Sequence, residues 1–284
     1  MSLSCLKNVK RAKNAPRPKA APAVAILEVV ADRSGSMSSL GPVPATGIRD
    51  FIQQHKQLPQ KTKVVFSLTT FDDTATTYYD GVDLHAMPDI TDEKMTEMVQ
   101  PRGMTLLVDT AMKRLHSLER RLVKEIAAMP PKVRQLKPKV VAVMIIVTDG
   151  MDNKSTLFTA SDLNKRITAA KTKGIEVIFM GANQDAINTG GQMGIHRGAA
   201  ITFGATPAAA AAAFAATTQN VYRCTSGSSS FVPAYTQSQR QSSAAALPLT
   251  APAYPSFGGG RGISAPLSPP PPPPPLGRQQ TVKY

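Results

Sequence analysis

The amino-acid sequence predicts an α/β fold, in which a doubly wound, mostly parallel sheet carries helices on both faces and disordered tails flank the domain. Two observations lead to this prediction. Strand-like apolar runs alternate along the chain with stretches whose apolar residues recur at helical spacing. In addition, residues 140–147 form an unbroken run of Val, Ala, Met and Ile. Such a run is typical of a strand that is buried on both faces of a parallel sheet.

Six strands are predicted from runs of β-branched and apolar residues bounded by turn residues. They are Val24–Ala31, Lys63–Phe71, Thr76–Val82, Val140–Val147, Ile175–Met180 and Ala199–Phe203. The third, with the turn signal Asp80-Gly81, is expected to be a short edge strand that runs antiparallel to the second.

Helical spacing or helix-end signals predict six helices. They are Thr46–Gln57, Thr91–Val99, Leu106–Ala128, Thr159–Lys173, Asn183–Met193 and Thr206–Asn220. Thr91 is expected to cap its helix, and Pro207 suits the first turn of the last one. Pro130 and Pro131 end the long third helix, so the basic, proline-containing segment to Pro138 is predicted to be a solvated loop.

The ends of the chain differ in composition from its middle. Residues 1–22 are rich in Lys, Arg, Ala and Pro, and residues 223–284 are rich in Ser, Ala and Pro, with a proline run at 269–275. Neither end holds enough apolar surface to offset the entropy lost on ordering. We therefore expect a disordered basic arm over 1–22, one domain over 23–222, and a disordered tail over 223–284.

Charge is concentrated in these ends. The formal net charge is +14, to which the arm contributes six positive charges and the tail five, so that +3 remains for residues 23–222. We expect the arm to make weak, nonspecific contacts with polyanions rather than the domain to bind nucleic acid through a basic face.

Other residue classes exclude further functions. Cys5 and Cys224 both fall in the expected flexible ends and indicate no disulfide framework. The four histidines fit no metal or catalytic spacing and are expected at the surface. No apolar run is long enough to span a membrane, and no signal peptide precedes Pro22. The sequence thus predicts a cytoplasmic protein without membrane contact.

Polar residues follow the first strand in the pattern Asp32-x-Ser34-x-Ser36. Ligands bind outside the carboxyl ends of strands in open α/β sheets, and carboxylate and hydroxyl oxygens suit Mg²⁺ or Mn²⁺. The alternative is that these side chains only cap the next helix. Two further stretches fall at the same edge of the predicted sheet, Thr105 within Arg102–Asp109 and Asp149 within Thr148-Asp149-Gly150.

Together, these three motifs resemble the von Willebrand factor A (vWA) domain with its metal-ion-dependent adhesion site, over residues 23–222. Phe71-Asp72-Asp73 and Gly181–Ala186 also look like the stand-alone vWA proteins of bacteria and viruses. The resemblance implies a Rossmann-like vWA fold and a non-enzymatic, metal-dependent protein-binding module. Its Mg²⁺ or Mn²⁺ would be completed by a Glu or Asp of a partner protein. The implied metal ligands are Asp32, Ser34, Ser36, Thr105 and Asp149.

Three more residues are candidates near that site. Asp109 is expected either to support the ligands from behind or to suit the helix dipole in the first helical turn. Met104 and Leu106 are candidates for an apolar collar that contacts the partner, although core packing is the more frequent use of such residues. Thr105 has an alternative role as the N-cap of the long helix.

Two other functions remain as alternatives. A haloacid-dehalogenase-like phosphotransferase would use Asp32 with Asp149 and Asp152, but it needs an acid where Ser34 stands. A scaffold or adaptor would act mainly through the proline run, which is a ligand for SH3, WW, EVH1 or profilin-type domains, or else a stiff spacer.

One residue departs from the family pattern: Glu28 lies within the first strand, with Lys63 as a candidate partner.

Overall fold

The computed structural model describes residues 22–182, 185–204 and 206–244, and all elements below lie within these ranges. The arm up to residue 21 and the chain from residue 245, with its proline run, lie outside the described residues. In the described chain no helix is long and apolar enough to cross a membrane.

A six-stranded sheet forms the centre of the domain, with the strand order β3-β2-β1-β4-β5-β6. Its strands are β1 (Val24–Asp32), β2 (Lys63–Phe71), β3 (Ala75–Asp83), β4 (Val140–Thr148), β5 (Ile175–Ala182) and β6 (Ala200–Phe203). β3 pairs antiparallel with β2, and all the other pairs are parallel. The predicted fold class and the predicted antiparallel edge strand are therefore confirmed.

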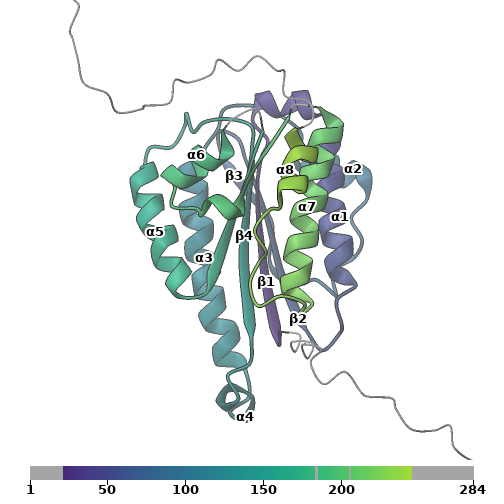
Figure 1. The fold of residues 1–284 in the computed structure, drawn as a ribbon, viewed down its shortest axis with the longest axis vertical. Coiled ribbons are helices and arrows are strands. Elements are labelled where there is room, and N and C mark those ends of the chain that lie inside the picture. The colour runs from purple at the N-terminus through teal and green to yellow at the C-terminus, as the bar shows by residue number, and fades with distance from the viewer. Residues whose placement is uncertain (1–21, 183–184, 205, 245–284) are drawn as a thin grey trace, which may run out of the picture. The chain divides into compact units, whose positions relative to one another are not determined.

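The helices lie on both faces of the sheet, as Figure 1 shows. They are α1 (Val43–Lys56), α2 (Asp92–Met98), α3 (Leu107–Ala128), α4 (Pro131–Gln135), α5 (Ala160–Thr172), α6 (Ala186–Gln192), α7 (Pro207–Thr225) and α8 (Gln237–Ala244), with short 3-10 helices at Gly35–Leu40 and Arg197–Ala199. In Figure 1, α3, α5 and α6 cover one face, and α1, α2, α7 and α8 lie on the other. This arrangement is that of a doubly wound sheet.

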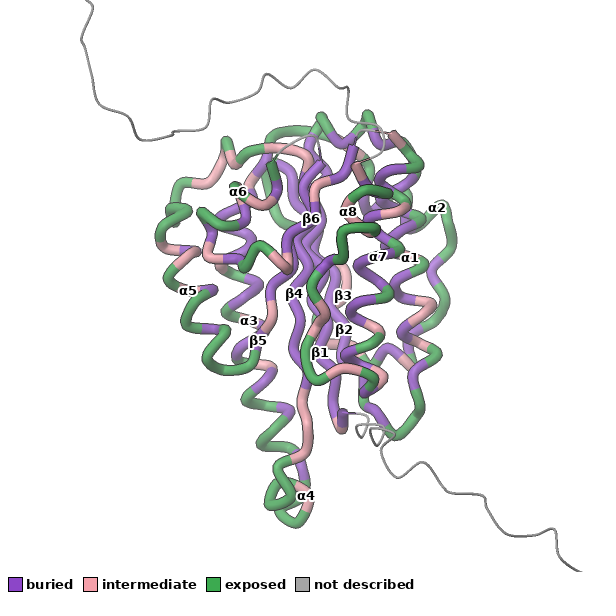
Figure 2. Tube along the Cα trace, viewed as in Figure 1, coloured by how far each residue is buried: buried purple, intermediate pink, exposed green. Residues whose placement is uncertain are grey.

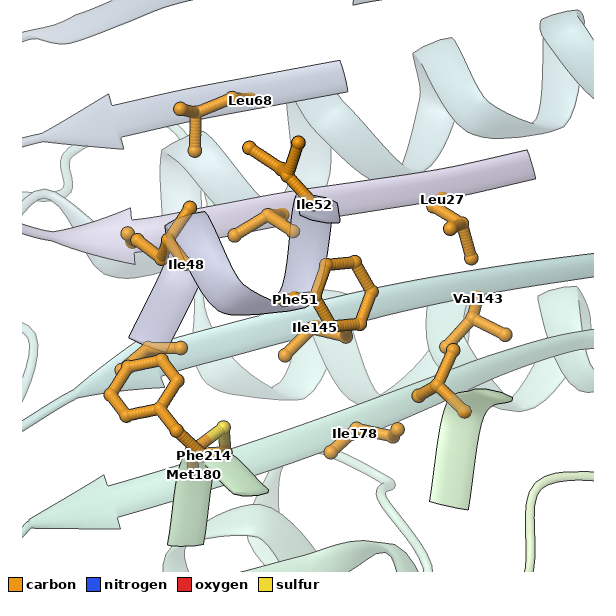
Figure 3. Packing of buried hydrophobic residues seen from close by; sticks show 14 of the residues in the cluster. Leu27, Ile48, Phe51, Ile52, Leu68, Val143, Ile145, Ile178, Met180 and Phe214 are labelled. Atoms are coloured by element: carbon orange, nitrogen blue, oxygen red, sulfur yellow. The ribbon is translucent and has the colours of Figure 1, made fainter. Parts of the chain in front are cut away.

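Alternation along the central strands divides the core into two clusters. Leu27 and Val29 of β1 point to the α1 and α7 side, where they join Ile48, Phe51 and Phe214 (Figure 3). Ile26 and Val30 point to the opposite face, against α3 and α5. Because successive side chains of a strand point to opposite faces, a strand between two helical layers must be apolar at nearly every position. Figure 2 shows the resulting buried centre.

Glu28 is the exception in β1, and the structure corrects its expected partner. The carboxylate is fully buried on the α3 side, where Arg114 donates from Nε to Oε1 at 2.7 Å and from Nη2 to Oε2 at 3.2 Å. Arg121 approaches Oε2 at 3.4 Å, and both arginines also bond Asp80 on β3. Lys63 instead pairs with Glu125. In the register of β1 and β2, Lys63 lies opposite Val24, at the start of β1, whereas the residue opposite Glu28 is Ser67.

The domain extends beyond its expected end at Tyr222, so that boundary is wrong. α7 continues to Thr225, and α8 follows after a segment whose Tyr235 is buried and bonds Thr217 at 2.6 Å. Ser243 of α8 donates to the Thr202 carbonyl of β6 at 2.9 Å. Cys224, expected in a flexible tail, is 1% exposed in α7, and burial raises the pKa of its thiol to about 11.

Two smaller expectations also change. The segment after Pro130 is not only a loop, because Pro131–Gln135 forms the short helix α4, all of it without a buried residue. His55 is not at the surface. Its ring is fully buried between α1 and α7, with Nδ1 at 2.7 Å from the Phe51 carbonyl oxygen and Nε2 without a hydrogen-bond partner in the described structure.

Candidate metal site

Asp32 ends β1 at the point where the order of the strands reverses. The chain continues from β1 to β2 on one side and reaches β4 on the other, so the carboxyl ends of β1 and β4 border a crevice. Asp32 is buried, and its two oxygens are held from both sides of that crevice. Oδ1 accepts the Ser34 amide at 2.7 Å, and Oδ2 accepts the Thr148 hydroxyl of β4 at 2.5 Å.

The two serines and Asp149 come together above Asp32. Ser34 Oγ lies 3.2 Å from Ser36 Oγ, and Ser36 donates to Asp149 Oδ1 at 2.7 Å. Ser34 stands at the start of the 3-10 helix but makes no side-chain capping bond. The capping interpretation of this loop is therefore wrong for Ser34. Its hydroxyl contacts that of Ser36, which in turn bonds the carboxylate that follows β4.

Thr105 reaches the same point from the loop before α3. A methyl group placed on Gly150 would lie 3.3 Å from Thr105 Oγ1 and 3.9 Å from Ser36 Oγ, so both hydroxyls border this glycine. The first amides of α3 are satisfied not by Thr105 but by Asp152, whose Oδ1 accepts from Leu107 at 2.9 Å. Thr105 is thus not the N-cap, and its hydroxyl makes no hydrogen bond to another described residue. The structure brings all five predicted ligand residues to one edge of the sheet.

Asp72 ties these loops together, a role that the sequence did not reveal. The carboxylate is buried and lies 3.0 Å from Arg33 Nε and 2.6 Å from Arg102 Nε. Burial alone would raise the pKa of Asp72, but the hydrogen bonds from Arg102 and Thr74 and the charge of Arg33 hold it below its usual value. Asp72, which follows β2, thus joins Arg33 of the β1 loop to Arg102 of the loop before Thr105. The Phe71-Asp72-Asp73 string marks Asp72 in the sequence but does not indicate its two arginine partners.

Asp109 lies in the first turn of α3, as one of its two expected roles requires, and its carboxylate also has a structural role that was not expected. Its buried carboxylate accepts the backbone amides of Thr156, Leu157 and Phe158 at 2.9–3.2 Å. Asp152 and Asn153 hold the start of the same segment, and the Asn153 side chain accepts the Thr105 amide at 2.8 Å. Asp109 thus anchors the loop after β4, and none of its hydrogen bonds reaches a predicted metal ligand. Neither Asp152 nor Asn153 carries a local motif that would have revealed this.

The electrostatics of the site suit a cation. Burial raises the pKa of Asp32 to about 6, against the opposing hydrogen bonds of Thr148 and Ser34, and burial also raises the pKa of Asp149. Among the described residues no Lys or Arg pairs with either carboxylate. Two carboxylates and three hydroxyls form a hard oxygen set, of the kind that holds Mg²⁺ or Mn²⁺ together with water. The described chain contains no cluster of three or more His, Cys, Asp or Glu that would indicate another metal centre.

Apolar side chains surround this edge of the sheet. Met104 is 42% exposed, and Met151, Leu157 and Phe158 of the loop after β4 are also exposed. Leu106, the other predicted member of the collar, instead packs in part against the α3 side of the core. We use the term apolar rim for Met104, Met151, Leu157 and Phe158. Met104 lies at the predicted position, while three of its four members were not recognised from the sequence.

The fold and this arrangement define the class of protein: a doubly wound α/β domain with a five-residue oxygen site at the topological switch point. The family model of the von Willebrand factor type A domain matches residues 27–203. The chain therefore belongs to the von Willebrand factor type A domain family. No curated protein matches the chain in sequence.

The solved structures to which the chain is similar are distant in sequence. Proximal thread matrix protein 1 from the mussel byssus, with a zinc-occupied MIDAS motif, has 18% identity over 67% of this chain and 43% of its own, with a TM-score of 0.43. The vWF domain of the pilus tip protein Mfa5 from Porphyromonas gingivalis has 13% identity over 71% and 95%, with a TM-score of 0.45. Manganese-loaded TRAP protein of Plasmodium vivax has 14% identity over 57% and 59%, with a TM-score of 0.37. This chain spans less than half the length of the mussel protein.

Proposed function

We propose that the domain is a protein-binding module, not an enzyme, whose site holds one Mg²⁺ or Mn²⁺ and is completed by a carboxylate of a partner protein. The observation that carries the proposal is the convergence of Asp32, Ser34, Ser36, Thr105 and Asp149 at one edge of the sheet. When bound, the cation would supply the positive charge that attracts an anionic ligand.

The composition of the site explains why an external carboxylate is needed. Only two of the five side chains are anionic, so they leave a divalent cation short of ligands and of negative charge. An incoming Glu or Asp gains more from this charge in a partly dehydrated crevice than in water. Buried Arg33 and exposed Arg102 both engage Asp72, which neutralises part of the positive charge that could compete with the cation for the partner's carboxylate.

The apolar rim adds a second requirement on the partner. Met151 is 77% exposed and Leu157 is 64% exposed, beside the site. Burying such side chains contributes roughly 25 cal/mol per Å² of apolar surface. The favoured partner segment therefore carries its acidic residue next to aliphatic or aromatic residues.

The phosphotransferase alternative is less well supported. Its second acid pair would require Asp152, yet Asp152 Oδ1 accepts from the amides of Leu107 and Val108 and from the Ser155 hydroxyl. A carboxylate committed to holding a helix N-terminus does not serve as a general acid at the crevice. The scaffold alternative rests on the proline run, which lies outside the described residues.

Metal binding is tested first, by calorimetric titration of the full chain with Mg²⁺. We expect binding by the wild type and at least a tenfold loss in Thr105→Ala, which removes a hydroxyl but no charge. Ser117→Ala, which removes a hydroxyl from α3 away from the site, is the matched control. Equal Mg²⁺ affinity in Thr105→Ala and the control would refute the assignment of the site.

Partner capture is tested with a peptide library selected on the immobilised chain in Mg²⁺. We expect chelator to release the selected peptides, and replacement of their central Glu by Gln to weaken binding at least tenfold. Ser34→Asp should also weaken capture, because the added carboxylate satisfies the cation from within the protein. Peptides retained equally in chelator would show that the metal takes no part in capture.

A further inference from the structure

A second exposed surface lies at the opposite end of the sheet from the metal site. The last turns of α3, α4 and the chain up to Lys139 extend beyond the start of β4 (Figure 1). We refer to residues 120–139 as the spur. The spur precedes Val140 and the site follows Thr148, so the length of β4 separates them. At about 3.3 Å per residue, this length is roughly 26 Å.

The spur is strongly basic. It contains seven Lys or Arg residues and one acid, Glu125, which is buried and paired with Lys63. Five of the basic residues are exposed and form no ion pair with a described residue: Arg120, Lys124, Lys132, Arg134 and Lys137. Since this positive charge is uncompensated, the spur attracts a negatively charged surface.

The spur also exposes aliphatic side chains. Leu136 is 81% exposed, Val123 68% and Ile126 40%, and Figure 2 shows α4 in green. Val123 and Ile126 are three residues apart in α3, so they share a face of the helix. The described structure exposes several large apolar side chains. Leu136, Val123 and Ile126 lie on the basic spur, and four others form the apolar rim.

The basic arm leaves the domain beside the spur. The Ala23 amide bonds the Lys139 carbonyl oxygen at 2.9 Å, and Val24 pairs with Val140. The arm carries six further Lys or Arg residues and no acid. The chain therefore joins a segment with six further positive charges to the domain at the end of the sheet where the five unpaired basic residues of the spur lie.

We propose that the spur binds the surface of an anionic lipid bilayer, with the arm adding to the attraction. Lys and Arg side chains would lie at the phosphate level while Leu136, Val123 and Ile126 enter the interface, since basic residues beside aliphatic ones are the pattern of peripheral membrane contacts. A single-stranded nucleic acid fits less well, because the spur has no aromatic side chain on which a base could stack. A duplex, which is bound through its phosphates, would leave exposed Leu136 and Val123 without a role. The sequence alone predicted no membrane contact, and the exposure of Leu136 and Val123 changes that expectation.

The test uses sedimentation of the full chain with vesicles of phosphatidylcholine, alone or mixed with phosphatidylserine. We expect binding only to the mixed vesicles and at least a tenfold loss in the double variant Lys132→Glu, Arg134→Glu. The control, Lys94→Glu with Lys113→Glu, makes the same charge change at exposed residues of α2 and of the first turns of α3. Equal loss in both double variants would overturn the assignment to the spur.

Apolar contact with the bilayer is tested separately, by fluorescence. Because the chain contains no Trp, a single introduced Trp is the only source of Trp emission. The emission of Leu136→Trp should shift to shorter wavelength with mixed vesicles, whereas that of Leu157→Trp, at another exposed position, on the apolar rim, should not. No shift in Leu136→Trp would refute insertion. Competing duplex DNA is then added to the vesicle-bound wild type and to vesicle-bound Leu136→Ser. If it releases both proteins from the vesicles equally, the spur is a general polyanion site and the lipid assignment is overturned.

Discussion

Replacing Arg114 by Met is expected to destabilise the domain by about 3–5 kcal/mol, because it leaves the fully buried Glu28 carboxylate without its main partner. Arg114 donates to both Glu28 oxygens, at 2.7 and 3.2 Å. After its removal, the nearest cation is Arg121, at 3.4 Å from Oε2, which also bonds Asp80 at 2.8 Å. One longer contact cannot repay the desolvation of the carboxylate.

The double variant Glu28→Leu, Arg114→Met should recover most of this loss. Apolar residues in place of a buried pair are often neutral or stabilising, so we expect the double variant to lie within about 1 kcal/mol of the wild type. Arg121 and Asp80 then keep each other as partners. The coupling energy between the two substitutions should therefore exceed about 2 kcal/mol.

Urea unfolding followed by far-UV circular dichroism measures these differences. Lys173→Met is the matched control, since Lys173 is half-exposed and Glu119 retains Arg166 after its loss. We expect a cost below about 1 kcal/mol for the control. A cost of that size for Arg114→Met, or a double variant as unstable as Arg114→Met alone, would refute the reasoning.

Three other outcomes are expected, which concern the buried His55, the loop anchor Asp109 and removal of the metal. Burial lowers the pKa of His55 from 6.5 to about 4, so the unfolded chain binds a proton below pH 6.5 that the folded chain does not. The free energy of unfolding should then fall by about 3 kcal/mol between pH 6.5 and 4, and urea titrations of His55→Phe should lose this dependence. Asp109→Ala should speed hydrogen exchange of the amides of Thr156, Leu157 and Phe158 at least tenfold, while unchanged exchange would show that the loop holds without Asp109. Chelator should leave the far-UV circular dichroism spectrum unchanged, because neither core cluster includes a predicted metal ligand, and a cooperative loss of signal would contradict this.

Much of the fold could be predicted because its signals are local. An unbroken apolar run such as Val140–Val147 is explained only by burial on both faces, and the observed strand adds one residue to it. Capping residues also act within a few positions, and Thr91 caps its helix as predicted. The residues of the site were predictable for the same reason, since three short motifs each follow or precede a regular element.

Side-chain contacts between residues that are distant in the sequence became known only from the tertiary structure. Glu28 could not be assigned to Arg114, 86 positions away, until α3 was placed on its face of the sheet. Asp152 holds the start of α3, and Asp72 joins two arginines, through contacts that leave no local pattern.

The segment after Tyr222 shows the same division between sequence and tertiary structure. Its composition is polar, so it predicts disorder, yet Tyr235 packs in the core and bonds α7, and Ser243 is buried and bonds β6. Sequence alone therefore determined most of the elements and their order, because periodicity and spacing act over a few residues, and its three motifs pointed to the candidate oxygen ligands at one edge of the sheet. Only the tertiary structure decided which buried charge meets which, what holds the site's loops and where the domain ends, because those contacts depend on how separate elements pack.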